Sequence, residues 1–233
     1  MIIHCIWEHN GDDSLLYAVE PIGAYARGEN LDTALKKMPG EVASYYKWRG
    51  QAVPGCLKIS VAGKKASTLT IRDADSDVLL PSEIPLLTAD EYEMLKALAL
   101  DSARDFLALY ESIPDKDAAA APPRQTFYGP VPRTAREMYE HTKNVNTYYF
   151  GEIGVEADNN GSIYECRQHG FALLETSPDF LQNKLYHGSY NEDWTLRKVL
   201  RRFIWHDRIH AKAMYRMGIQ LFGAENIVNP FHF

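Results

Sequence analysis

The spacing of apolar residues changes near residue 80. Before that point, short apolar runs alternate with turn-forming residues, which is typical of strands joined by tight turns. After Pro85 the apolar residues recur every three or four positions, which is the period of amphipathic helices. The pattern therefore predicts an α+β protein in two domains, a small N-terminal α/β module over 1–80 and an all-α part over 81–233.

The N-terminal pattern predicts several strands and one interrupted helix. Apolar runs predict strands at residues 2–7, 14–25 (one or two strands), 57–61 and 68–71. Asn30 is a good N-cap residue and begins a helix. We expect Pro39 to interrupt this helix, because proline lacks the amide hydrogen of a helical turn, and 42–48 to continue as a second helical piece.

The second part predicts helices with recognisable starts. Thr88 begins a helix through residue 113, and Thr134 with Glu137 forms a capping box for the next. The remaining helical segments are predicted at 162–176, 177–186 and from Asp193 or Thr195 to about 218. Residues 115–133 contain four alanines and four prolines, which predicts a long connector, either disordered or a functional covering loop.

Two histidines lie one turn apart on the last predicted helix. His206 and His210 belong to its apolar stripe, and His141 occupies a similar stripe on the helix over 134–150. Neutral imidazoles are good ligands for divalent cations, and three protein ligands leave coordination positions open for water or substrate. The histidines therefore predict one divalent metal site. The alternative is three ordinary core histidines, each satisfied by hydrogen bonds.

The last helix also carries a family resemblance. Residues 193–200 (DWTLRKVL), followed by 206–210 (HDRIH), resemble the final helix of the DinB-like (YfiT/DinB) four-helix bundles. In that family a Trp-Ser/Thr-x-Arg entry precedes a His-x-x-x-His pair, and an earlier helix supplies the third histidine, where His141 stands here. The resemblance covers about residues 85–220, and the connector over 115–133 departs from it. It implies a homodimer, a bound nickel or zinc ion, and a thiol-dependent transferase or isomerase activity using a low-molecular-weight thiol.

The N-terminal part resembles a different family. Residues 19–28 and the helix start at 30–35 are similar to the HicB-like small α/β fold, over roughly residues 1–75. In antitoxins of that type the domain binds a small protein toxin. No recognisable DNA-binding domain follows here, so the resemblance implies a binding or regulatory module.

Composition narrows the environment and the partners. The net charge of −6 argues against nucleic acid as a partner, although basic residues lie on the last predicted helix, largely away from its histidine stripe. Those residues form either a phosphate-binding ridge or a solvated face with acidic neighbours. An exposed Trp205 among them would indicate a subunit contact or cation–π stacking.

No apolar run approaches the ~20 residues of a membrane helix, so no membrane association is expected. Three widely separated cysteines and no signal-peptide pattern predict a cytoplasmic protein with reduced thiols.

Two function hypotheses remain open. The first is a metal-dependent enzyme, a thiol transferase or a hydrolase, that acts on a small-molecule substrate at the open face of the ion. The second is a non-catalytic binding or regulatory protein with a structural metal, whose N-terminal domain recognises a protein partner. His187 and Tyr190, which precede the last helix, could line the site in either case, and loop polarity explains them equally well. The sequence nominates no catalytic side chain.

Overall fold

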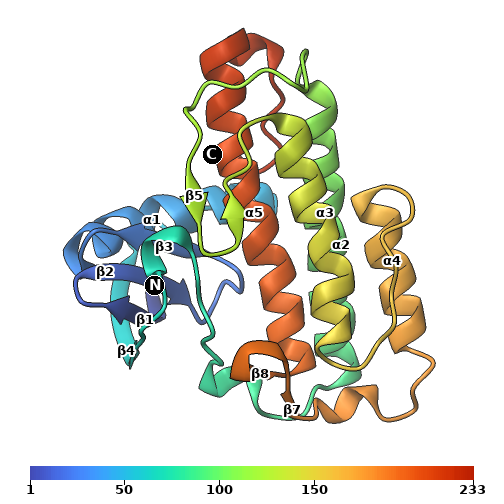
Figure 1. Cartoon of the computed structure of the whole chain (residues 1–233). Coiled ribbons are helices and arrows are strands. Elements are labelled where there is room, and N and C mark those ends of the chain that lie inside the picture. Colours follow the sequence, from blue (N-terminus) through green and yellow to red (C-terminus); the bar gives the residue numbers. More distant parts are fainter. The chain divides into compact units, whose positions relative to one another are not determined.

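The computed structural model describes residues 1–233, which form two compact units. Unit 1 comprises Met1–Ser82 together with Phe231–Phe233, and unit 2 comprises Glu83–Pro230. The chain combines helices with small sheets, which confirms the α+β class (Figure 1). Residues 231–233, which the sequence pattern assigned to the helical part, belong to unit 1. None of the helices combines the length and hydropathy needed to cross a bilayer.

Unit 1 contains a four-stranded sheet with the order β3-β2-β1-β4. β1 pairs antiparallel with β2 and parallel with β4. The β1–β2 hairpin is tight because Asn10 pairs with Asp13, which leaves Gly11 at a φ of 58°, where a glycine is favoured. The strands are β1 (Ile2–Asn10), β2 (Asp13–Ala18), β3 (Tyr25–Gly28) and β4 (Lys58–Ala66).

One continuous helix, α1 (Leu31–Trp48), packs on this sheet. Its cap is the expected one, since the side chain of Asn30 accepts a hydrogen bond from the amide of Thr33 at 2.9 Å. The predicted interruption at Pro39 is wrong. Met38 and Val42 are both fully buried on the same face, and this burial outweighs the one hydrogen bond that proline removes.

The predicted strand at 68–71 is also wrong. A 3-10 turn occupies Ile71–Asp73 in its place, with the Ile71 side chain buried. The carboxylate of Asp75 accepts a hydrogen bond from the amide of Thr70 at 3.3 Å. Such local bonds from aspartate side chains to the backbone compete with strand pairing.

Unit 2 is built from four helices that lie side by side (Figure 1). α2 packs against α4 and α5, and α3 also packs against α4 and α5. Capping boxes at Thr88, Thr134 and Ser162 begin three of them, and the Thr195 side chain caps the fourth. The helices are α2 (Ala89–Ser112), α3 (Ala135–Gly151), α4 (Ile163–Leu174) and α5 (Leu196–Phe222).

The segment before α5 differs from its prediction. No helix forms over 177–186, where the structure has a 3-10 turn at Phe180–Gln182 and a short strand. Asn183 ends the turn in the left-handed region at a φ of 51°, and its side-chain amide donates to the backbone oxygens of Glu83 and Pro85 at 2.7 Å. These bonds hold the segment as a loop. The short strands of unit 2 are β5 (Gln125–Thr126), β6 (Gly129–Pro130), β7 (Tyr186–His187) and β8 (Asp193–Trp194).

Candidate metal centre

The three predicted histidines come together in unit 2. The potential ligand atoms of His141, His206 and His210 all lie within 4.8 Å of one another. The ring centroids of His206 and His210 are 4.4 Å apart. The ring centroid of His141 lies 5.2 Å from that of His206 and 4.7 Å from that of His210. Such a cluster could hold one metal ion.

Helix geometry explains why these side chains meet. His206 and His210 are four residues apart on α5, so their side chains lie one above the other on one face. α3 packs against that face of α5, with the ring of Tyr149 at 5.3 Å from the ring of Phe203. His141 precedes Tyr149 by about two turns of α3 and therefore reaches the level of the α5 pair.

Burial favours the neutral form of two of the three imidazoles. Desolvation lowers the pKa of His206 well below its ordinary value, and the positive charges that His210, His141 and Arg202 can carry lower it further. Desolvation also lowers the pKa of His141. Neutral imidazole is the protonation state that binds a metal ion, so the electrostatic setting of both side chains fits a ligand role.

One ring nitrogen gives an independent test of that role. Nδ1 of His206 is buried and has no hydrogen-bond partner. An ordinary core histidine would satisfy both ring nitrogens, because a buried polar atom left unpaired costs about 1–3 kcal/mol. The donor set and this unpaired nitrogen therefore fit a divalent cation better than they fit a hydrogen-bonded core histidine.

Three aromatic side chains surround the cluster. The rings of Tyr149 and Trp205, each 2 % exposed, lie 6.0 Å and 6.5 Å from the ring of His206. Tyr128, from the connector before α3, lies 5.4 Å from the ring of His141 and is 40 % exposed. The cluster is thus enclosed on one side by the helices and covered on another by the connector. Sequence reasoning did not identify Tyr128, whose only signal was its place in an unusually long connector.

A buried ion pair lies next to the cluster along α5. The carboxylate of Asp207 accepts hydrogen bonds from the Arg167 guanidinium of α4 and the Ser102 hydroxyl of α2. All three residues are fully buried. Burial raises the pKa of Asp207, while Arg167 and Ser102 act in the opposite direction. The Asp207 carboxylate thus links α5 to α2 and α4. The sequence pattern did not predict this ion pair.

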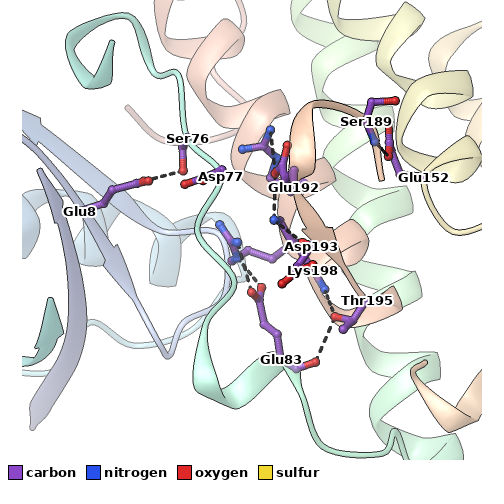
Figure 2. A network of polar contacts seen from close by, with 12 residues as sticks. Glu8, Ser76, Asp77, Glu83, Glu152, Ser189, Glu192, Asp193, Thr195 and Lys198 are labelled. Carbon is purple, nitrogen blue, oxygen red and sulfur yellow. Dashed lines mark hydrogen bonds and ion pairs between the residues drawn. The ribbon is translucent and has the colours of Figure 1, made fainter. Parts of the chain in front are cut away.

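Several basic residues of α5 are buried and do not form a solvated face. Lys198 and Arg201 are almost completely buried. Lys198 forms an ion pair with Glu192 (Figure 2), and Arg201 forms one with Glu83. The acidic neighbours expected from the sequence are present, but the expected solvation is wrong at these positions. Trp205 is likewise buried, with the Arg202 guanidinium 4.8 Å from its ring centroid, which is the cation–π arrangement.

His187 stands apart from the cluster. Its Nδ1 lies 2.7 Å from the carboxylate of Asp193 on the β7–β8 pair, and its side chain is largely exposed. β8 directly precedes α5, so His206 lies roughly 16 Å further along the helix at 1.5 Å per residue. Tyr190 is 91 % exposed in the same loop. Neither residue belongs to the group of three histidines.

Comparison with protein-family models, with characterised proteins and with solved structures finds no match to this chain. The site must therefore be interpreted from its own geometry.

Proposed function

We propose that this chain is a metal-binding protein in which His141, His206 and His210 hold one divalent ion, nickel or zinc. We further propose that unit 2 is a four-helix bundle of the DinB-like type and forms a homodimer, and that unit 1 is a HicB-like module that recognises a protein partner. The observation that carries the metal proposal is the convergence of three histidines within 4.8 Å, with a buried Nδ1 of His206 lacking any hydrogen bond.

The activity that fits this centre best is transfer or hydrolysis on a small-molecule substrate. An ion held by His141, His206 and His210 would supply Lewis acidity toward a water or a low-molecular-weight thiol. The chain's own residues would orient and shield that ion. Tyr149 and Trp205 exclude water from its helical side, and Asp207 is bound to Arg167 and Ser102, so it holds α5 in place and does not act as a base.

Two of the three cysteines are poorly suited to nucleophilic catalysis. Burial raises the pKa of Cys5 to about 12 and also raises the pKa of Cys166. Both side chains therefore remain protonated thiols at neutral pH, and the thiolate is the reactive form. This favours chemistry at the ion over chemistry at a side-chain sulfur.

Elemental analysis of protein purified without a histidine tag tests the metal proposal. We expect close to one nickel or zinc ion per chain, and we expect His206→Ala to lose most of it, because a site with two ligands binds divalent ions much more weakly. His187→Ala is the matched control, since His187 lies outside the cluster and its variant should keep the metal. Full metal retention after replacement of both His206 and His210 by alanine would rule the site out.

A spectroscopic titration separates the enzyme from the structural-metal alternative. In cobalt-substituted protein, a small thiol should produce a sulfur-to-metal charge-transfer band if a coordination position is open. The same band should persist when all three cysteines are replaced by serine. A cobalt spectrum that no thiol and no water analogue alters would favour a structural metal and a binding role.

A further inference from the structure

A small hairpin brings an aromatic ring onto the histidine cluster. β5 and β6 pair antiparallel within the connector between α2 and α3 (Figure 1). The two residues at its tip are Phe127 and Tyr128, whose rings contact each other edge to face at 4.9 Å. The Tyr128 ring is tilted by 35° over the ring of His141 at 5.4 Å.

Tyr128 differs from the other rings near the cluster in its exposure. Tyr149 and Trp205 belong to the long helices and are 2 % exposed, so they cannot move without disturbing the core. Tyr128 is 40 % exposed, and its ring contacts the rings of His141 and Phe127. Of these three rings, only that of Tyr128 can move away from the histidines without disturbing the packing of a helix.

The connector makes several bonds near the helix ends, at its base, and few at the 125–130 hairpin, its tip. Near the helix ends, Arg136 forms a two-bond ion pair with Asp117, and the Arg133 guanidinium donates to the backbone oxygen of Ala121. At the tip, the strands have two residues each, and the Thr126 hydroxyl donates to the oxygen of Gly129. An isolated two-stranded hairpin is only marginally stable, so the tip can open locally while the base stays closed.

We propose that the 125–130 hairpin is a lid on the three-histidine centre and that Tyr128 is the residue that controls ligand access to it. This inference rests on the proposed metal site. With the Tyr128 ring against His141, entry and exit of ligands depend on opening of the hairpin. The contact uses the face of the Tyr128 ring and not its hydroxyl, so phenylalanine preserves the lid and alanine removes it.

Two rates test the lid in the full-length chain. The first is extraction of bound zinc by the chromogenic chelator 4-(2-pyridylazo)resorcinol. The second is modification of His141 by diethyl pyrocarbonate in metal-free protein, followed by mass spectrometry. We expect Tyr128→Ala to accelerate both rates about five-fold, because the closed state loses its main tip contact. Tyr128→Phe should match the wild type, and so should Tyr190→Ala, which makes the same substitution at an exposed tyrosine of another loop.

The two readouts separate failure of the lid from failure of the metal site. If the wild-type protein holds no zinc, the proposed function fails, and the modification rate of His141 still decides whether Tyr128 covers the cluster. If zinc binds but Tyr128→Ala leaves either rate unchanged, the lid is overturned. Equal acceleration in Tyr128→Phe and Tyr128→Ala would also overturn it, because the ring face would then not be the cover.

Discussion

At the scale of single residues, protonation of the His206 imidazole is opposed by its surroundings. It is buried, and it lies close to two other imidazoles and to the positive charge of Arg202. Each of these factors favours the neutral ring. A metal ion binds the nitrogen lone pair of a neutral imidazole. The surroundings that disfavour a charged histidine therefore favour the protonation state that a metal ligand needs.

This setting predicts how stability without metal depends on pH. The pKa values of His141 and His206 are lowered in the folded state from the ordinary value of 6.5. The unfolded state therefore binds more protons below about pH 6.5, and the contribution of these groups to stability is present above that pH and lost as the pH falls through it. The slope can approach about 1.4 kcal/mol per pH unit for each fully shifted group.

Chemical denaturation of metal-free protein at pH 7.5 and 5.5 measures this effect. The free energy of unfolding should fall more in the wild type than in His206→Phe, which replaces the imidazole by an apolar ring of similar size. Carboxylates that titrate in this range affect both proteins equally. The contribution of His206 is therefore the difference between the two proteins in their loss of unfolding free energy. Equal losses in both would contradict a buried neutral imidazole.

The grouping of the three histidines was predictable from the sequence, whereas their surroundings were not. His206 and His210 are one helical turn apart, and helical periodicity alone places them in the apolar stripe. Tyr128 reaches the cluster from a connector with no periodic pattern, and Arg167 reaches Asp207 from a helix forty residues away in the chain. Contacts of this kind depend on tertiary packing, and no local pattern reports them.

At the scale of the elements, the Asp207–Arg167 pair decides how α5 is oriented. Asp207 follows His206 directly, so the two side chains point about 100° apart around the helix. Binding of Asp207 to Arg167 of α4 and Ser102 of α2 directs the adjacent His206 toward α3 and His141. The ion pair therefore acts as a positioning element for the histidine cluster.

Breaking this pair should be costly. We expect Asp207→Asn to lower the free energy of unfolding by about 3 kcal/mol, because it leaves the buried Arg167 charge without a counter-charge. The double variant Asp207→Leu with Arg167→Met removes both charges and should recover most of the loss. Urea denaturation measures both. Asp179→Asn is the control, since the exposed pair of Asp179 with Lys184 should contribute little to stability. A double variant no more stable than Asp207→Asn would contradict this account.

Element boundaries were predictable where side chains cap the helices. Thr134 and Glu137 form the capping box expected from their spacing, and Thr195 caps α5. The prediction failed where burial or distant hydrogen bonds decided the outcome. α1 continues through Pro39 because the residues before and after it are buried on the same face of the helix. Residues 177–186 are not helical, because the Asn183 side chain is hydrogen-bonded to a segment one hundred residues earlier.

At the scale of the whole molecule, the two ends of the chain belong to the same unit. The Phe231 ring is fully buried and lies 5.3 Å from the ring of Trp48, and its backbone oxygen accepts a hydrogen bond from the Ser44 hydroxyl at 2.9 Å. Unit 1 is therefore discontinuous in sequence. A piece ending at residue 82 lacks a core side chain and should be less stable than unit 1 in the full chain.

Unit 2 should fold alone, because its polar core and its histidine cluster are contained within it. His141, His206 and His210 lie in Glu83–Pro230, as do the Asp207–Arg167 pair and the Arg201–Glu83 pair. We expect a fragment of residues 81–230 to keep its helical circular dichroism, to unfold cooperatively and to hold one metal ion per chain. Ending it at Pro230 removes the three residues that belong to unit 1. The same fragment with His206→Ala should stay folded and lose the ion, which separates loss of the site from loss of the fold. A fragment that is unfolded by circular dichroism would show that the two units depend on one cooperative core.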